Sequence, residues 1–215
     1  MTIQVSEGVP LLSPRSERRS PLCHNLLLDS RLYALLLKFD EDLAAEAKRA
    51  GCPVCGGRLD SGWYRRKPRV SPTTTLPASY DRRFSFSCST RTCRKRRTPA
   101  STRFLGRRIY LGAVVVLATA MQQGNTPWRM SQLREALGVS AQTLNRWRVW
   151  WAEAFAQSAF WKAAAAVFSP PVAEDASPSS LLERFSGAAH ERLAALLRFL
   201  SPLSTSAAYV PDLRR

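Results

Sequence analysis

Four of the five cysteines form two pairs whose spacing is typical of metal ligands. Cys52 and Cys55 stand in Cys-Pro-Val-Cys-Gly-Gly, where a tight glycine turn lets backbone amides point at both sulfurs. Cys88 and Cys93 follow after 32 intervening residues and are separated by a spacer of four. Four thiolates suit tetrahedral zinc and leave no open coordination position, so we predict one structural Zn²⁺ at these cysteines. The alternative is a set of structural or redox thiols, although the βαβ context of a thioredoxin-like CxxC is absent.

The fifth cysteine, Cys23, adjoins His24 and is either part of an alternative ligand pair or an ordinary thiol before a helix. The N-terminal residues lack the order of basic head, apolar run and small-residue cleavage site found in signal peptides. The longest apolar stretch, Leu111 to Met121, is far shorter than the ~18 residues that span a bilayer. We therefore expect a cytoplasmic, nucleoid-associated protein without a membrane partner, whose cysteines serve metal rather than disulfides.

Positive charge is concentrated in one part of the chain. The 215 residues carry 32 Lys and Arg against 16 Asp and Glu, a formal net charge of +16. Residues 61–110 hold 14 of the basic residues and a single acid, Asp81. Such an excess favours a polyanionic partner, and arginine forks match phosphate oxygens; a merely solvated charged face is the alternative. We predict phosphate contacts from Arg91, Arg94, Lys95, Arg96, Arg97, Arg107, Arg108 and Arg148.

The segment from Ser131 to Trp147 has the pattern of a helix-turn-helix. Its apolar residues suit two helices packed at a steep angle, Gly138 takes the turn, and Ser140 caps the second helix. Four side chains are then expected to face outward, where amides read adenine and arginine reads guanine. We predict base contacts from Gln142, Thr143, Asn145 and Arg146. The alternative is a pair of packed core helices with no role in DNA binding.

The LxxxLGVSxxTLxRW pattern within this segment resembles the helix-turn-helix of bacterial repressors and transposases. Together with CPxCGG, the order of zinc ribbon, basic stretch, connecting helix and helix-turn-helix over residues 50–150 is similar to a transposon module. Such modules are the N-terminal DNA-binding parts of bacterial insertion-sequence transposases and their accessory proteins. The resemblance implies binding to double-stranded DNA at element ends, or repression of the element's own promoter, in the context of transposition or transcription regulation.

Periodicity and turn residues predict a mainly α protein with a small β zinc ribbon and a helix-turn-helix after the ribbon. Two β-type runs are expected in the ribbon, Tyr80 to Cys88 and, more weakly, Trp63 to Val70. Helices are expected at about 107–123, from 141 to about 168, and at 181–200. The predicted divisions are a disordered basic leader (1–28), an N-terminal helix (29–50), the ribbon (51–98), a helical domain (99–168) with the helix-turn-helix at about 127–150, a linker (169–180), and a C-terminal helix with a loose tail (181–215).

No constellation of catalytic residues is visible in the sequence. The acids after residue 150 have no strand pattern to carry a metal-binding triad, and the chain has two histidines, His24 and His190. We therefore expect sequence-specific binding of double-stranded DNA without catalytic activity. One rival is a zinc-ribbon adaptor for a transposase or transcription complex with only nonspecific DNA affinity, and another is a nuclease or recombinase fragment acting in trans. The apolar face of the helix from 141 is either a homodimer seam or packs within the chain.

Overall fold

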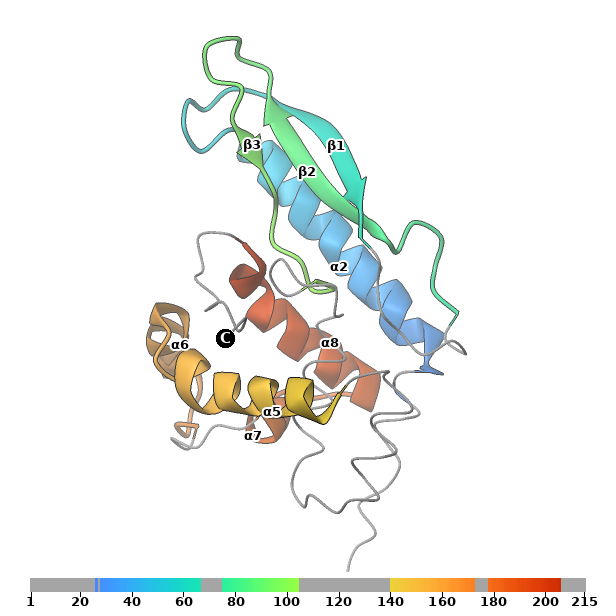
Figure 1. Cartoon of the computed structure of the whole chain (residues 1–215), viewed down its shortest axis with the longest axis vertical. Helices are drawn as coiled ribbons and strands as arrows, with labels where there is room; N and C mark the ends of the chain where they lie inside the picture. Colours follow the sequence, from blue (N-terminus) through green and yellow to red (C-terminus); the bar gives the residue numbers. More distant parts are fainter. Residues whose placement is uncertain (1–25, 27, 67–74, 105–139, 173–177, 206–215) are drawn as a thin grey trace, which may run out of the picture.

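The computed structural model describes residues 26, 28–66, 75–104, 140–172 and 178–205 (Figure 1). These residues form a small antiparallel sheet and a larger helical part, in agreement with the predicted mainly α fold. No helix in the described ranges is both long and apolar enough to span a membrane. The helices are α2 (Ser30–Arg49), α5 (Ala141–Val149), α6 (Ala159–Ala164), α7 (Pro178–Leu182) and α8 (Ala189–Leu200), and the strands are β1 (Leu59–Arg65), β2 (Arg82–Cys88) and β3 (Arg96–Arg97).

Helix α2 begins and ends where its local sequence predicts. The Asp29 side chain accepts the Arg31 backbone N–H at 3.0 Å and caps the first turn. After the C-cap residue Ala50, Gly51 takes a φ of 73°, a left-handed conformation that glycine adopts without strain. The predicted helix at 30–50 is therefore confirmed.

The sheet has the order β1–β2–β3, with both pairs antiparallel. Leu59 lies opposite Cys88 at one end of the β1–β2 pair, and Arg65 lies opposite Arg82 at the other. The predicted strand at 80–88 is present from Arg82 onward. The weaker strand, predicted at 63–70, instead runs from Leu59 to Arg65. Its first residues, Leu-Asp-Ser-Gly, do not alternate between apolar and polar, so the position of this strand is set by its pairing with β2.

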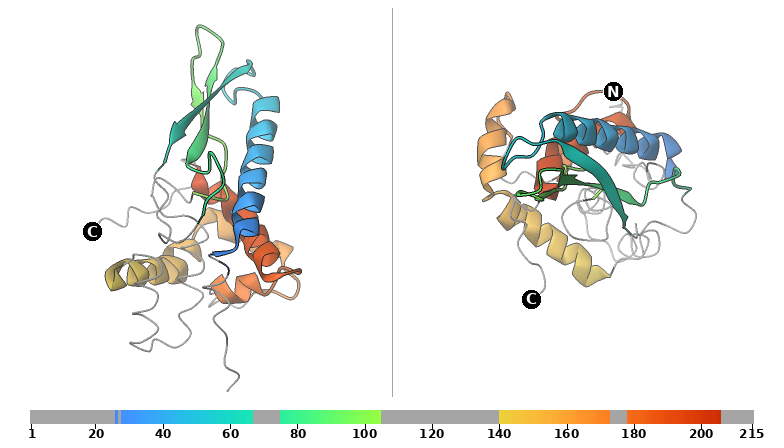
Figure 2. Two further views of the ribbon diagram at one scale, coloured as in Figure 1. Left: turned by 90° about the vertical axis from the view of Figure 1, so that its right-hand side faces the viewer. Right: turned by 90° about the horizontal axis from the view of Figure 1, so that it is seen from above.

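The C-terminal half of α2 lies against one face of the sheet, as both views in Figure 2 show. Side chains from the helix, the sheet and the cysteine region share one small core: Ala44, Ala47, Cys52, Leu59, Phe86 and Cys88. The N-terminal half of α2 belongs to a second, larger core with α8, where Leu32 and Leu36 join Leu193 and Leu197. Helix α2 therefore runs through both hydrophobic cores.

The predicted helix from 141 to about 168 is wrong, because the chain breaks at Ser158. Helix α5 continues as a wider turn of helix (Trp150–Phe155), and Ser158 then adopts an extended conformation with ψ of 143°. The Ser158 hydroxyl accepts the Trp161 backbone N–H at 3.1 Å, so this serine caps α6 instead of continuing the earlier helix. Trp147, Trp150 and Trp151 are buried in the larger core, which supports packing within the chain over a long dimer seam.

The C-terminal prediction also needs correction. Helix α7 begins at Pro178, inside the expected linker at 169–180, and α8 begins only at Ala189, so 181–200 is not one helix. Gly187 separates them at a φ of 103°, and the Glu191 carboxylate accepts the Ala188 N–H at 2.8 Å. The expected loose tail instead starts with a buried helical turn, Ser201–Ser204. Of the expected disordered leader, Leu26 and Leu28 are helical, and Leu26 is buried in the larger core, so its end is ordered. Residues 1–25, the helix at 107–123, the first helix of the helix-turn-helix and residues 206–215 lie outside the described residues.

Candidate metal centre and the basic surface around it

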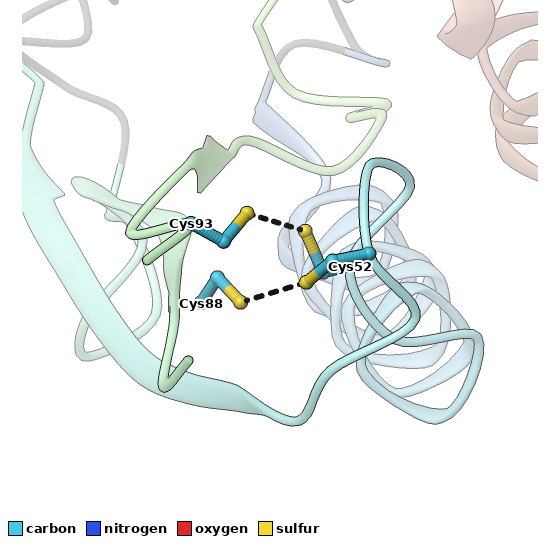
Figure 3. Close-up of side chains that lie close together, drawn as sticks. Cys52, Cys88 and Cys93 are labelled. Carbon is cyan, nitrogen blue, oxygen red and sulfur yellow. Dashed lines mark hydrogen bonds between the residues drawn. The ribbon is translucent and has the colours of Figure 1, made fainter. Parts of the chain in front are cut away.

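The four predicted metal ligands come together at the end of the sheet, with all four sulfur atoms within 4.8 Å of one another. The sulfurs of Cys52 and Cys93 are 3.7 Å apart, and those of Cys55 and Cys88 are 3.5 Å apart (Figure 3). None of these four cysteines forms a disulfide. The edges of a tetrahedral ZnS₄ centre are about 3.8 Å, given a Zn–S bond of about 2.3 Å. The cluster could therefore hold one metal ion, and the predicted grouping is confirmed.

The first pair is positioned by a turn that starts directly after α2. The Cys52 N–H donates to the Gly57 carbonyl at 2.9 Å, and the Gly56 N–H donates to the Cys52 carbonyl at 2.8 Å. A Cβ at Gly57 would collide with the Thr90 hydroxyl and lie 3.3 Å from the sulfurs of Cys55 and Cys88. A side chain at this position would displace the Thr90 hydroxyl and crowd both sulfurs, so the second glycine of CPxCGG fits a metal centre.

The second pair lies between β2 and β3. Cys88 is the last residue of β2, and its N–H donates to the Lys95 carbonyl at 2.9 Å. The N–H groups of Cys93 and Arg94 both donate to the Thr90 carbonyl, at 3.0 and 3.1 Å. Arg94 takes a φ of 47°, in the left-handed region. The four-residue spacer thus folds into a tight turn that returns Cys93 to the first pair.

Backbone dipoles and neighbouring thiols shift the pKa values of this cluster in opposite directions. The Gly57 N–H and then the thiols of Cys88 and Cys93 lower the pKa of Cys55 to about 6. The pKa of Cys93 is about 12: the Lys95 N–H lowers it, but burial and the neighbouring thiols together outweigh that effect. Four thiolates cannot coexist here without a cation, and a bound divalent metal would ionise all of them. The donor set therefore fits a structural metal.

Basic side chains surround the second pair. Arg91, Arg94, Lys95 and Arg96 are exposed; together they form what we term the metal-loop basic set. Arg97, also predicted to contact phosphate, differs from them, because its guanidinium donates to the Ala47 carbonyl at 3.2 Å and the Gly51 carbonyl at 2.7 Å. Arg97 thereby caps carbonyl groups at the C-terminal end of α2, and it is not part of the exposed set. Arg107 and Arg108 lie outside the described residues.

The predicted base-reading residues divide into two groups on α5. Gln142 and Asn145 are exposed, as is Arg148 one turn later. Thr143 is buried, so the expectation that it faces outward is wrong. Its hydroxyl lies 3.0 Å from that of the N-cap residue Ser140 and accepts a hydrogen bond at 3.2 Å from Arg146, which is half-buried. Of the predicted residues, Gln142, Asn145 and Arg148 therefore form the accessible face of this helix.

A buried ion pair, not predicted from the sequence, lies between the two cores. Asp40 and Arg103 are both fully buried, and the Arg103 Nε donates to the Asp40 carboxylate at 2.8 Å. The rest of the Arg103 guanidinium donates to the Tyr80 carbonyl at 2.6 Å and the Arg82 carbonyl at 2.8 Å. One signal was available in the sequence: Asp40 occupies the helical position between Leu36 and Ala44, on the apolar face of α2.

Neighbouring residues complete this network. The Thr102 N–H and hydroxyl both donate to the Asp40 carboxylate, at 2.6 and 2.8 Å. Ser101 donates its hydroxyl to the same carboxylate and its N–H to the Ser204 hydroxyl. Asp40 thus connects α2 to segment 101–103, and that segment to the C-terminal turn. Cys23 and His24 lie outside the described residues.

Comparison with known proteins adds no relative: no family model, no curated protein and no solved structure matches this chain.

Proposed function

We propose that this protein binds double-stranded DNA in a sequence-specific manner, with a structural zinc ion at Cys52, Cys55, Cys88 and Cys93 and without catalytic activity. The observation that carries the proposal is the metal-loop basic set, four exposed cationic side chains on a loop that the cysteine cluster holds at Cys88 and Cys93. The context that suits it is transposition or transcription regulation in a bacterium.

The geometry of this loop suits phosphate binding. Segment 89–97 contains no acid, so no intervening carboxylate neutralises its arginines. Metal bonds at Cys88 and Cys93, on either side of Arg91, and the pairing of β3 with β2 just after Lys95 would fix the backbone. This lowers the conformational entropy lost when these side chains contact a phosphate backbone. Arginine guanidinium groups donate in a fork that matches two phosphate oxygens. This surface supplies affinity for DNA but no sequence preference.

In this proposal α5 provides the sequence preference, and it is the second helix of a helix-turn-helix at about 127–150. Gln142 and Asn145 are exposed near its capped N-terminus, the part of a recognition helix that contacts base edges. Amide side chains pair with adenine in the major groove. Arg146, half-buried, and the exposed Arg148 then contact guanine or the backbone beside them.

Zinc is the metal that the donor set favours. Four cysteine sulfurs at tetrahedral separations suit Zn²⁺ over the hard cations Mg²⁺ and Ca²⁺, which take oxygen ligands. Four protein ligands leave no position for water or substrate, so the ion supplies structure and no chemistry.

The test is selection of a random duplex pool by the full-length, zinc-loaded protein, followed by sequencing of the bound fraction. The proposal predicts an enriched motif, and two spaced copies of it would indicate a homodimer. Bound DNA without any enriched motif would contradict sequence-specific readout. A protein that retains no duplex even at low salt would contradict DNA binding and favour an adaptor for a transposase or transcription complex. Metal-dependent nicking of the pool would contradict the non-catalytic assignment.

A further inference from the structure

An open groove lies between α2 and the β1–β2 pair, and none of the four cysteines lines it. Its volume is about 700 Å³, and Ala44, Ala45, Phe84 and Phe86 form an apolar floor between the helix and the sheet. The charged residues of its lining are Glu41 and Lys48, both from α2. The Lys48 ammonium group donates to the Ser61 hydroxyl at 2.7 Å along one side. The groove is large enough for a planar ring system and open to solvent along its length.

Trp63 stands at this groove with half of its side chain exposed, at 51%. The guanidinium carbon of Arg82 lies 4.4 Å from the centroid of the Trp63 ring, a cation–π contact. Arg82 lies opposite Arg65 in the register of the sheet, so two guanidinium groups lie two strand positions from the tryptophan, on the same face of the sheet. The Arg65 Nε forms a long ion pair with the Asp81 carboxylate, at 3.7 Å.

We propose that this groove binds unpaired nucleotides, with one base stacked on the face of the Trp63 ring that Arg82 does not cover and the adjoining phosphates at Arg65 and Arg82. An exposed aromatic ring on a strand, beside cationic side chains, is the arrangement by which proteins hold single-stranded nucleic acid. The positive charge of the two guanidinium groups, within a chain of net charge +16, favours this polyanion over an apolar protein segment. Bases inside a duplex are covered on both faces, whereas unpaired bases offer a free face for stacking.

This inference does not depend on the proposed duplex binding, because it uses neither the metal-loop basic set nor α5. It adds a second nucleic-acid site with a different ligand, a single strand or the unpaired end of a duplex. A failure of duplex binding would leave the Trp63 site untouched, and the reverse also holds.

The test is fluorescence anisotropy with a labelled oligothymidylate and the full-length, zinc-loaded protein. Trp63→Ala is expected to weaken single-strand binding about tenfold, since stacking on an aromatic ring contributes on the order of 1–3 kcal/mol per base. Trp63→Phe keeps an aromatic face and is expected to retain most of the affinity. Val167→Ala, at another exposed apolar residue (78% exposed), is the matched control and is expected to bind as the unmodified protein does.

A second readout locates the contact directly. Photo-crosslinking of a bromouridine-containing oligonucleotide to the unmodified protein is expected to modify the peptide that contains Trp63. Single-strand affinity that survives Trp63→Ala would overturn the proposal and leave the groove to a protein partner. Equal losses for single strand and duplex, or crosslinks confined to other peptides, would overturn it as well.

Discussion

Arg94 holds a backbone conformation that glycine adopts far more readily, at a φ of 47° in the turn that ends the second cysteine pair. A bulky residue in the left-handed region costs about 1 kcal/mol. The Arg94 side chain is exposed, and its guanidinium extends the metal-loop basic set. Strain of this kind at an exposed position is a reason to propose a function for the side chain.

Replacing Arg94 with glycine separates these two effects. Arg94→Gly is expected to leave the free energy of unfolding unchanged or raise it by up to about 1 kcal/mol, and to weaken DNA binding. Arg91→Gly is the control, because Arg91 is exposed on the same loop without a positive φ. Urea unfolding and DNA titration together check the pair. Loss of stability in Arg94→Gly alone would show that this arginine supports the fold.

Replacing Gly57 with alanine is expected to weaken metal binding. Gly57→Ala places a methyl group against the Thr90 hydroxyl and the sulfurs of Cys55 and Cys88. Chelator competition should therefore show zinc affinity at least about tenfold weaker, since the sulfurs would have to move. Gly56→Ala is the control: its Cβ meets nothing within 4 Å, and only its φ of 70° adds strain. Equal affinity of the two variants would contradict the close approach at Gly57.

The opposed pKa values of the thiols predict how zinc affinity depends on pH. In the metal-free protein at pH 7.5, Cys55, with a pKa of about 6, is a thiolate, and Cys93, with a pKa of about 12, keeps its proton. Zinc must displace the Cys93 proton, so affinity should fall about tenfold or more for each unit that pH decreases from 8 to 6. Below pH 6 the dependence steepens, because Cys55 is protonated too. Zinc titrations across this range check the slope, and a flat profile would contradict it.

At the scale of elements, α2 links the ribbon to the helical core, and Asp40 lies at the junction. Asp40→Asn would leave the Arg103 guanidinium buried without a counter-charge, which should lower the free energy of unfolding by about 3 kcal/mol. Asp42→Asn removes an exposed partner of Lys38 on the same helix and should change it by less than about 0.5 kcal/mol. Urea unfolding measures both, and comparable effects would show that the buried pair adds little.

The bounds of the elements were predictable where the signals are local. Asp29 and Gly51 mark the ends of α2 by their own hydrogen bonding and backbone freedom, so sequence alone places this helix. The break at Ser158 was missed because the apolar steps of three and four continue through it, and only the side-chain hydrogen bond to the Trp161 N–H ends the helix there. β1 was misplaced because its register comes from a partner strand that lies about 20 residues away in the sequence.

The candidate site was also predictable from the sequence only in part: the cysteine cluster was, and the division of the arginines into exposed and buried was not. Cysteine spacing predicted the metal cluster, because ligand geometry requires little from the rest of the fold. The arginine stretch could not be divided from sequence into surface and interior. Arg83 and Arg103 are buried, and Arg83 donates to the Pro99 carbonyl at 2.6 Å; only the folded chain brings these acceptors near. Basic composition therefore overstates the charge available to a partner.

For the whole molecule, the cysteine cluster and α5 lie toward opposite ends of its long axis (Figures 1 and 2). Under the proposed function, the metal-loop basic set and the exposed face of α5 therefore contact separate stretches of DNA. The loop supplies phosphate affinity at one place and α5 reads bases at another. The relative placement of these two DNA-contacting surfaces depends on the connection from the sheet through α2 and Asp40 to the helical core.

The most direct test of the account is the salt dependence of duplex binding by the zinc-loaded protein. Arg91→Ala/Lys95→Ala/Arg96→Ala removes three cations of the metal-loop basic set, and Lys38→Ala/Arg49→Ala/Lys162→Ala removes three exposed cations elsewhere. The first variant should reduce the slope of log Kobs against log salt by about 2–3, since each phosphate contact contributes about 0.9. The second should leave the slope close to that of the unmodified protein. Equal slopes for all three proteins would contradict DNA binding through the metal-held loop.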